Sequence, residues 1–545
     1  MAERSPFWQI EDFSLGQNNF ADPRRLMPLN VGDAAEGQLV QNFDIIEQGA
    51  LFVSPGFEQI SDTGEDGKCF VATLNSSSAN RFLIAVAGGK FFNVNTVTGI
   101  STEIDAGHRW ATPSGITHIN AVQFRGTTSR DYLIFVDDVA THVPKKIRYD
   151  GANLVIADMA ASPPGNNTGY IIEEMMGFLF IAQDRTLYYS QSQDETAWGA
   201  PGGTIGFNNR LVGLKKTSDK KLKVLMSDGQ SQEVSFLFDD TALTYTPKKD
   251  EFMLGIGGLA HKTTQHVLND TYFLQEEGVS YFGQNPAYNS SGLRANTLSF
   301  KIDNSIQQVN YDKAEIACAG YLKKKYTLSL PVGRGTTYNN ETFQYFTEHD
   351  AWVYKPGIQA YSYTVYREDD QREMYFGSAT DGIVYKFNNS FNYGGNNYTS
   401  RWVSKTFNYG TSVITKRVPY IEVAGSKPLG AQFQVIVSSD GVTETYLVDD
   451  TALVVNGSGG YIGDSYLGDE FFGGNFTSVY GQFYRFFQRI PLSQRVIEGR
   501  EFTYEIKREG QGSPFKIDFF NSKYELSTEA KVKDRHINTN VISAG

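Results

Sequence analysis

A short alternation of apolar and polar runs at residues 177–198 is the clearest pattern in the chain. An apolar run at 177–182 is followed by a polar stretch at 183–186, and an aromatic run at 187–190 comes next. Two runs of strand length around a tight polar break predict a β-hairpin. A polar loop follows and ends at Trp198. The pattern therefore predicts two paired strands and a rim loop held by one large aromatic side chain.

The side chains of this stretch also predict how it packs. Neighbouring residues on a strand point to opposite faces, so Tyr188 and Tyr189 cannot both lie on the same side of the sheet. We expect one of them to pack against a neighbouring sheet. Trp198 is expected to be a packing anchor rather than a binding residue.

Variants of the same unit recur along the chain at intervals of roughly 45 residues, a spacing typical of repeat architectures. They fall at residues 68–104, 118–157, 169–198, 208–238, 255–283 and 314–354, with a partial copy at 361–387. A repeated, mostly four-stranded sheet arranged radially is a β-propeller. We therefore predict an all-β chain with a propeller of about six or seven blades over residues 61–395.

Five Asp-Gly pairs lie between strand-like runs, where this dipeptide favours a two-residue hairpin turn. An Asp-Gly pair can also belong to a calcium-binding loop. None of the five has the regular series of oxygen ligands that such a loop uses. We therefore expect hairpin turns at all five, whose aspartates are Asp66, Asp150, Asp228, Asp381 and Asp440.

The two ends of the chain have a different texture. Residues 1–60 are irregular and predict an extended lead-in that partly joins the propeller. From residue 396 to 530 the predicted strands are longer and alternate in polarity, which is typical of an antiparallel β-sandwich. A glycine-rich loop at 456–474 is expected on its surface, either as a simple loop or as a contact with another subunit. Residues 531–545 are expected to form a loosely ordered tail.

Net charge, cysteine content and the distribution of apolar residues each limit what the protein can be. The formal net charge of −12 argues against a protein that grips nucleic acid by its phosphates, but it does not exclude a protein that lets DNA pass by without sticking. The two cysteines, Cys69 and Cys318, are expected to be buried free thiols. No secretory signal or membrane-spanning segment is visible, so we expect a soluble protein made in a cytoplasm.

Candidate chemistry is sparse. His261 and His266 are close in sequence, but their spacing does not place both on one face of a strand, and no third metal ligand is near. Acidic residues adjacent on a strand point apart and cannot be the facing carboxylates of a glycosidase. We therefore predict no catalytic, metal-binding or cofactor-binding residue and a protein that is not an enzyme. The acidic runs concerned are Glu173-Glu174, Glu276-Glu277, Asp137-Asp138 and Glu368-Asp369-Asp370.

Lysines cluster in two segments, 214–223 and 323–325. We interpret both as solvated turns at blade rims, with contact to an acidic neighbouring subunit as the alternative. No aromatic residues are interleaved with them across a broad face. We therefore do not predict a nucleic-acid site at either segment.

Several segments resemble the β-propeller tail proteins of tailed bacteriophages, most closely the nozzle or packaged-DNA stabilisation family of short-tailed phages. The resemblance covers most of the chain and rests on loose motifs rather than on one signature. It is carried by residues 42–44, 49–51 and 55–56 of the lead-in, by 177–182 with 187–190, Asp194 and Trp198, and by 375–377, 381–385, Trp402 and 405–407.

The resemblance implies a structural virion protein of the phage tail, assembled in the host cytoplasm into a ring that is expected to be a hexamer. Such a nozzle would line and close the DNA exit channel and contact adjacent tail adaptor and fibre proteins. Genomic DNA would pass through it without sequence-specific binding. Two alternatives stay open. One is another ring adaptor or fibre-docking hub of the tail, and the other is a carbohydrate-binding or glycoside-hydrolysing propeller.

Overall fold

The computed structural model divides the chain into two compact units. Unit 1 comprises Met1–Phe57, Tyr345–Pro356 and Asn388–Gly545, and unit 2 comprises Glu58–Gln344 and Gly357–Phe387. The described residues are 7–27, 34–46, 49–77, 80–126, 131–159, 169–198, 203–216, 221–239, 244–268, 270–284, 293–368, 371–387, 390–409, 413–449, 483–509 and 513–526.

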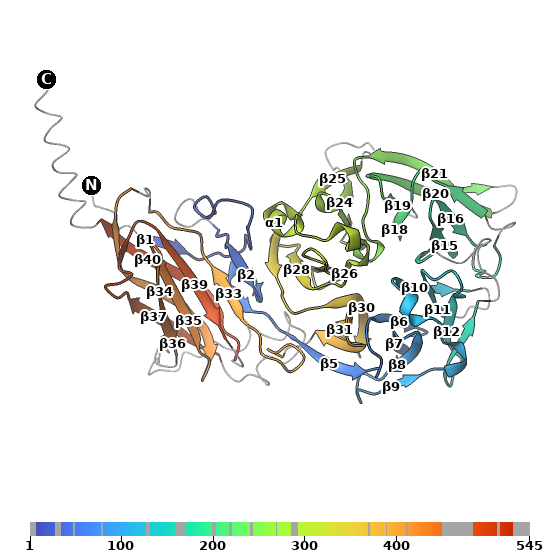
Figure 1. Cartoon of the computed structure of the whole chain (residues 1–545), viewed down its shortest axis with the longest axis horizontal. Helices are drawn as coiled ribbons and strands as arrows, with labels where there is room; N and C mark the ends of the chain where they lie inside the picture. Colours follow the sequence, from blue (N-terminus) through green and yellow to red (C-terminus); the bar gives the residue numbers. More distant parts are fainter. Residues whose placement is uncertain are drawn as a thin grey trace, which may run out of the picture. The chain divides into compact units, whose positions relative to one another are not determined.

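Unit 2 is a β-propeller whose blades follow one another in a ring (Figure 1). Six blades are separate four-stranded sheets. In ring order, the first blade consists of β30 (Ala360–Glu368), β31 (Gln371–Ser378), β32 (Ile383–Phe387) and β5 (Phe57–Asp62), and the second of β6 (Cys69–Asn75), β7 (Arg81–Ala87), β8 (Lys90–Val94) and β9 (Ser101–Glu103). The third blade consists of β10 (Ile119–Arg125), β11 (Asp131–Asp137), β12 (Lys145–Tyr149) and β13 (Leu154–Asp158), and the fourth of β14 (Ile171–Met175), β15 (Phe178–Gln183), β16 (Thr186–Tyr189) and β17 (Gly203–Gly206). The fifth blade consists of β18 (Leu211–Lys216), β19 (Leu222–Met226), β20 (Gln230–Asp239) and β21 (Thr244–Leu254), and the sixth of β22 (Gln265–Val267), β23 (Asp270–Gln275), β24 (Gly278–Gln284) and β25 (Leu293–Thr297).

A further meander completes the ring between β22 and β30. It consists of β26 (Cys318–Leu322), β27 (Lys325–Leu330) and β28 (Glu341–Phe346), and the chain of β28 ends in unit 1. The predicted propeller of six or seven blades is therefore confirmed, with six complete sheets and this meander. Short helices lie in the connections: η2 (Ala106–His108), η3 (Pro113–Gly115), η4 (His261–Thr263), η5 (Ser299–Ile302), α1 (Asp303–Ile306) and η6 (Tyr311–Ile316).

The ring is closed by a strand from the N-terminal part of the chain. Strand β5 is the outermost strand of the blade that β30, β31 and β32 begin, so two segments about 300 residues apart share one sheet. Beyond β5, Thr63 Oγ1 donates a hydrogen bond to the carbonyl oxygen of Gly382 at 2.7 Å, and the N–H of Gly382 donates to Gly67 at 2.7 Å. The partial copy that the sequence indicated at 361–387 is thus completed from the other end of the propeller.

The core of unit 2 lies between neighbouring blades rather than at one centre. Phe180 and Leu187 of one blade pack with Leu214, Val224 and Val234 of the next, all fully buried. Similar clusters join the other described pairs of blades around the ring. Each sheet therefore buries both faces against its neighbours, as the continuous apolar runs of its inner strands require.

Residues 177–198 form β15, β16 and the loop that follows, and the predicted hairpin is confirmed. The aromatic ring of Tyr189 lies 6.3 Å from that of Phe178 and 6.2 Å from that of Phe180, in the cluster shared with the next blade. Trp198 donates its indole N–H to the carbonyl oxygen of Glu195 at 2.8 Å and packs on the cluster between the third and fourth blades. It is a packing anchor.

Four of the five Asp-Gly pairs connect successive strands, as predicted. The clearest is the β35–β36 connection, where Asp440 and Gly441 have φ values of 45° and 87°, the left-handed conformations that a type I′ turn requires. The prediction for Asp66 is wrong. Gly67, which follows it, lies between β5 and β6 and pairs with Asp381 of another Asp-Gly turn. This pairing joins positions far apart in sequence, so the local turn signal cannot reveal it.

Unit 1 contains two sheets that pack face to face through aromatic side chains, which confirms the predicted β-sandwich. The ring centroid of Phe520 lies 6.1 Å from that of Trp402 and 4.9 Å from that of Tyr504, and Phe433 stacks on Phe515 at 4.4 Å. One sheet contains β1 (Phe7–Ile10), β3 (Phe43–Ile45), β4 (Leu51–Val53), β34 (Lys416–Pro428), β37 (Phe483–Pro491), β38 (Glu498–Gly499) and β40 (Lys516–Leu526). The other contains β29 (Ala351–Tyr354), β2 (Leu39–Gln41), β33 (Ser400–Val403), β39 (Phe502–Arg508), β35 (Phe433–Ser439) and β36 (Val442–Val448).

The predicted lead-in is built into this sandwich. Strand β1 pairs with β40, β2 pairs with β33, and β4 pairs with β40, so both sheets contain strands from both ends of the chain. The order along the chain therefore differs from the expected sequence of lead-in, propeller and sandwich. The propeller is inserted between two parts of unit 1, and only β5 of the lead-in joins it. The loop predicted at 456–474 and the tail at 531–545 lie outside the described residues.

Gly377 tests the close packing between blades. A Cβ atom at this position of β31 would lie 2.1 Å from the backbone oxygen of Cys69 on β6, and backbone cannot give way as a flexible side chain can. We expect Gly377→Ala to lower the free energy of unfolding by about 1–3 kcal/mol. Gly206→Ala is the matched control, because a Cβ atom there would meet nothing within 4 Å, and it should change stability by less than about 0.5 kcal/mol. Equal effects in chemical denaturation would contradict this account of the packing.

Candidate functional site: the axial end of the propeller

Polar side chains gather where the first strands of the blades begin. Lys68 directly precedes β6, His118 precedes β10, Tyr170 precedes β14 and Arg210 precedes β18. Because the first strands of successive blades line the axis and run in the same direction, these residues meet at one end of it. Lys262 in η4, Glu315 in η6, Tyr361 in β30 and Asp138 after β11 complete the group. We call these eight residues the axial cluster.

Glu315 links blades that are not neighbours in the ring. Its carboxylate accepts a hydrogen bond from the guanidinium of Arg210 at 3.2 Å, and its other oxygen lies 3.4 Å from Nε2 of His118. The imidazole of His118 stacks on the ring of Tyr170 at 4.5 Å, and the Tyr170 hydroxyl accepts a hydrogen bond from Arg210 at 3.2 Å. The contact with His118, followed by the guanidinium charge of Arg210, lowers the pKa of Glu315 to about 2, so this carboxylate is ionised at neutral pH.

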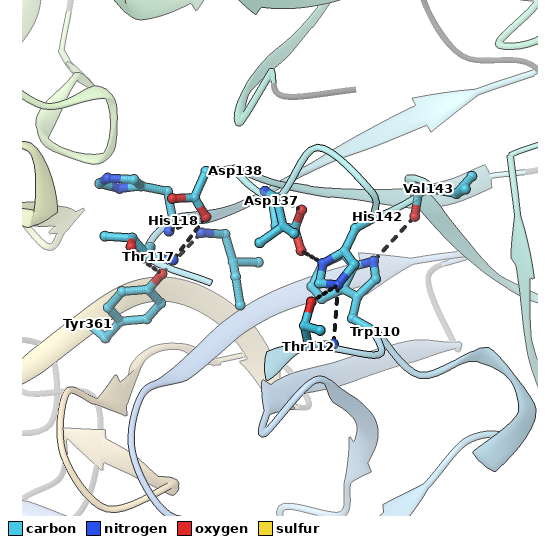
Figure 2. Close-up of polar contacts among 11 residues, drawn as sticks. Trp110, Thr112, Thr117, His118, Asp137, Asp138, His142, Val143 and Tyr361 are labelled. Carbon is cyan, nitrogen blue, oxygen red and sulfur yellow. Dashed lines mark hydrogen bonds and ion pairs between the residues drawn. The ribbon is translucent and has the colours of Figure 1, made fainter. Parts of the chain in front are cut away.

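Tyr361 makes a second connection across the ring. Its hydroxyl accepts a hydrogen bond from the backbone N–H of Ile119 at 3.0 Å and donates one to the carbonyl oxygen of Thr117 at 2.8 Å (Figure 2). Tyr361 belongs to β30 and Ile119 to β10, so this hydrogen bond joins two blades that are separated in the ring by the blade of β6 to β9. Burial raises the pKa of the Tyr361 phenol, which stays protonated and can serve as donor and acceptor at once.

Two lysines lie over the ring of Tyr361. The ammonium of Lys262 is 3.5 Å from the ring centroid and donates a hydrogen bond to the Tyr361 carbonyl oxygen at 2.9 Å. The ammonium of Lys68 is 5.6 Å from the same centroid. Burial lowers the pKa of Lys262 to about 7 and also lowers the pKa of Lys68. The geometry is that of a cation–π site with two cations on one aromatic ring.

Asp137 and Asp138, one of the acidic doublets, point in different directions, as predicted for neighbours on a strand (Figure 2). Asp138 accepts hydrogen bonds from the backbone N–H groups of Thr117 at 2.9 Å and His118 at 3.0 Å, which fixes the start of β10. Asp137 instead contacts Nδ1 of His142 at 2.5 Å, and both side chains are almost fully buried. The doublet therefore serves two separate networks.

The second network has the order of a hydrolase triad: carboxylate, imidazole, hydroxyl. Nε2 of His142 lies 2.9 Å from the hydroxyl of Thr112, and the indole of Trp110 stacks on the imidazole at 5.8 Å with 5° between the planes. Sequence reasoning missed this arrangement because Thr112 lies in a different connection from Asp137 and His142. The only local signal was a histidine shortly after an acidic doublet.

Hydrogen bonds around this triad hold two connections together. His142 Nε2 also faces the backbone N–H of Thr112 at 3.4 Å, and the backbone N–H of His142 donates to Val139. Trp110 donates its indole N–H to the carbonyl oxygen of Val143 at 3.2 Å (Figure 2). Both ring nitrogens of His142 are thus engaged in joining the segment at 110–112 to the loop at 137–143.

Five lysines of the two lysine segments lie near carboxylates of their own chain. Lys215 and Lys216 on β18 lie 3.7 Å and 2.8 Å from the carboxylates of Glu173 and Glu174 on the neighbouring blade. The structure thus brings one lysine segment and one acidic doublet together. In the same segment, Lys221 and Lys223 pair with Glu233, and in the second segment Lys323 lies 3.7 Å from Glu373. The carboxylates that these lysines contact belong to the same chain, whereas the alternative interpretation of the lysine segments placed them against an acidic neighbouring subunit.

The histidines and cysteines that the sequence singled out are buried or structural. His261 accepts a hydrogen bond from the backbone N–H of Leu214 at 3.3 Å, and burial lowers its pKa to about 3, so it is neutral. His266 lies on β22. Cys69 and Cys318 are buried free thiols, as predicted, and burial raises the pKa of Cys318 to about 12.

Within the described ranges, no group of three or more His, Cys, Asp or Glu side chains is placed to hold a metal ion. In that part of the chain no helix has the length and apolar character needed to cross a membrane.

Tyr361→Phe tests the connection across the ring. The change leaves the buried N–H of Ile119 without its acceptor, so we expect the free energy of unfolding to fall by about 1–3 kcal/mol. Tyr149→Phe is the control, because that hydroxyl donates only to the exposed carbonyl of Gly151, and it should cost less than about 0.5 kcal/mol. Chemical denaturation measures both, and an unchanged Tyr361→Phe variant would show that the contact does not stabilise the ring.

Lys262 gives the stability a defined pH dependence. Its pKa is about 7 in the folded chain against an ordinary value of 10.5, so between these values the unfolded chain binds a proton that the folded chain does not. The free energy of unfolding therefore gains a contribution that rises with pH through this window. We expect Lys262→Met to remove it and Lys216→Met, a lysine paired with Glu174, to retain it. Denaturation at a series of pH values measures the slope, and equal slopes for wild type and Lys262→Met would refute the assignment.

Comparisons with known proteins concern the fold alone. No protein-family model and no curated protein matches the chain. Similar solved structures include YCF48 from Cyanidioschyzon merolae, with 11% identity, 61% of this chain and 98% of that chain covered and a TM-score of 0.37. The WD40 β-propeller domain of Doa1 has 10% identity, with 61% and 97% covered and a TM-score of 0.37. The extracellular domain of a one-component system from B. thetaiotaomicron has 11% identity, with 78% and 59% covered and a TM-score of 0.37.

Proposed function

We propose that the protein is a structural subunit of the tail of a short-tailed bacteriophage, located in the distal ring, or nozzle, that lines and closes the DNA exit channel. The proposal starts from the resemblance of the sequence segments to that family. The structural observation that carries it is the insertion of the propeller into a sandwich made from both chain ends. The chain passes between the two units four times, so neither unit is a module on a single linker.

The charge distribution supports the same proposal. The rim lysines Lys215, Lys216 and Lys323 are each near a carboxylate of their own chain, so they are not a free basic stripe that would track a phosphate backbone. The net charge of −12 leaves an acidic surface, and an acidic wall repels DNA and lets it slide. These properties suit a conduit better than a DNA-binding protein.

Two other functions are alternatives to the nozzle. A ring adaptor or fibre-docking hub of the same tail would have the same architecture and charge, and only its position in the particle would differ. A carbohydrate-binding or hydrolysing propeller would use the axial end, where ligands of propellers can be reached from several blades. The intramolecular hydrogen bonds of Glu315 and Tyr361 at that end, and the contact of His118 with Glu315, favour the structural role.

The proposal predicts that the purified full-length chain, alone or with the tail proteins beside it, forms closed rings. Native mass spectrometry would give the number of subunits, expected to be six, and electron microscopy of the intact particle would give the position. Density for the propeller at the distal tip supports the nozzle, and density at a junction with another ring or a fibre supports the adaptor or hub. Monomers at high concentration with tail partners present would overturn both. Specific binding on a glycan array, or release of reducing sugar, would favour the third reading.

A further inference from the structure

Many lysines of the propeller form ion pairs with carboxylates, whereas Lys68 and Lys262 contact an aromatic ring. Lys215, Lys216, Lys221 and Lys223 each have a carboxylate within 4 Å, as do Lys90, Lys145, Lys146, Lys323 and Lys386. In the described part of the chain, Lys68 and Lys262 contact the ring of Tyr361 instead, and no carboxylate forms an ion pair with either. Two cations thus share one aromatic ring without an anion between them.

The surroundings of the two ammonium groups leave a net positive charge. The charged or titratable groups that interact with Lys262 are Lys68, Asp138, Cys318, His118 and His261. Cys318 is a protonated thiol, and burial lowers the pKa of both histidines. Those that act on Lys68 are Asp138 and Lys313. Asp138 is the one carboxylate named for either lysine, and its Oδ1 already accepts two backbone N–H groups. Lys68, Lys262 and Lys313 therefore share one nearby carboxylate, Asp138, which already accepts hydrogen bonds from the backbone.

Burial makes this arrangement costly as it stands. Both lysines are partly removed from water, and a desolvated ammonium without a counter-ion is unfavourable. The lowered pKa values of both express the same cost. A bound anion would remove the repulsion between the lysines and replace part of the lost hydration.

We propose that the axial end of the propeller is a binding site for a small doubly charged oxyanion, inorganic phosphate or a phosphate monoester, held between Nζ of Lys68 and Nζ of Lys262. A dianion matches two ammonium groups, and its several oxygens can accept from both at once. Tyr361 orients the two lysines through its ring and holds Lys262 by its carbonyl oxygen. The site is independent of the role in a tail, because it rests on residues of one propeller.

Binding at this site is coupled to proton uptake. Lys262 has a pKa near 7, so about one pH unit above that value most molecules carry it unprotonated. A bound dianion favours the ammonium form, because opposite charges at short range raise the pKa of a lysine. Phosphate binding above neutral pH therefore draws a proton from the buffer, and the affinity falls as pH rises.

The test is isothermal titration calorimetry of the full-length chain with inorganic phosphate at constant ionic strength. The wild type is compared with Lys262→Met, Lys68→Met and the control Lys216→Met, whose ammonium pairs with Glu174 on another part of the propeller. Each axial variant should weaken binding by about 10-fold to 100-fold, the value of one charge-assisted hydrogen bond, and the control should not. Titration in buffers of different ionisation enthalpy should show proton uptake in the wild type and none in Lys262→Met.

Three ligands define the chemistry. Inorganic phosphate and a phosphate monoester are expected to bind, and the tighter of the two identifies the source of the phosphoryl group. Acetate, a single negative charge, is expected to bind much more weakly. No heat with either phosphate ligand, an equal affinity for acetate, or a loss of affinity as large in Lys216→Met as in Lys262→Met would overturn the proposal. Circular dichroism spectra of the variants that match the wild type at the assay pH show that a lost signal is not lost structure.

Discussion

The structure of the propeller depends on one set of long-range hydrogen bonds, those that join β5 to the blade begun by β30, β31 and β32. The outermost strand of each blade is an edge in any propeller, and without β5 the backbone groups along one side of β32 would be unpaired. The contacts of Thr63 and Gly67 with Gly382 extend the junction beyond the strand itself. Closure also places the first strands of all blades around one axis, and the axial cluster exists because of it.

At that axis the polar side chains have a structural role that apolar ones could not fill. Each of Glu315 and Tyr361 contacts a blade that is not its neighbour, through hydrogen bonds of fixed direction. Apolar packing between adjacent blades sets the distance between sheets, whereas these bonds fix which blades face each other across the ring. Within the described residues no carboxylate forms an ion pair with Lys68 or Lys262, so the polar network lacks a direct counter-charge at these two lysines.

The pairing of charged side chains between blades explains why the sequence contains clusters of acidic and basic residues to which no catalytic or binding function is assigned. The acidic doublets and the lysine segments looked like candidates for binding, and the structure uses several of them to neutralise each other between blades, as for Glu174 with Lys216. Asp137, His142 and Thr112 join two connections through hydrogen bonds that have the order of a catalytic triad. Residue type alone does not separate such a structural network from a reactive one, since both need a buried carboxylate and an oriented imidazole.

The sequence by itself determined the class of fold and most strands, because alternating runs, Asp-Gly turns and aromatic residues act over a few neighbouring positions. The hairpin of Phe178–Gln183 and Thr186–Tyr189 could be predicted in this way, as could the packing of one of the two tyrosines Tyr188 and Tyr189, and the structure shows that it is Tyr189. Tertiary structure alone decided that β5 closes the ring, that β1, β2 and β4 belong to the sandwich, and that Gly67 pairs with Asp381. It also decided the axial cluster, whose members lie between Lys68 and Tyr361 in sequence. Such contacts depend on strand register and on the closure of the ring, and neither leaves a local pattern in the chain.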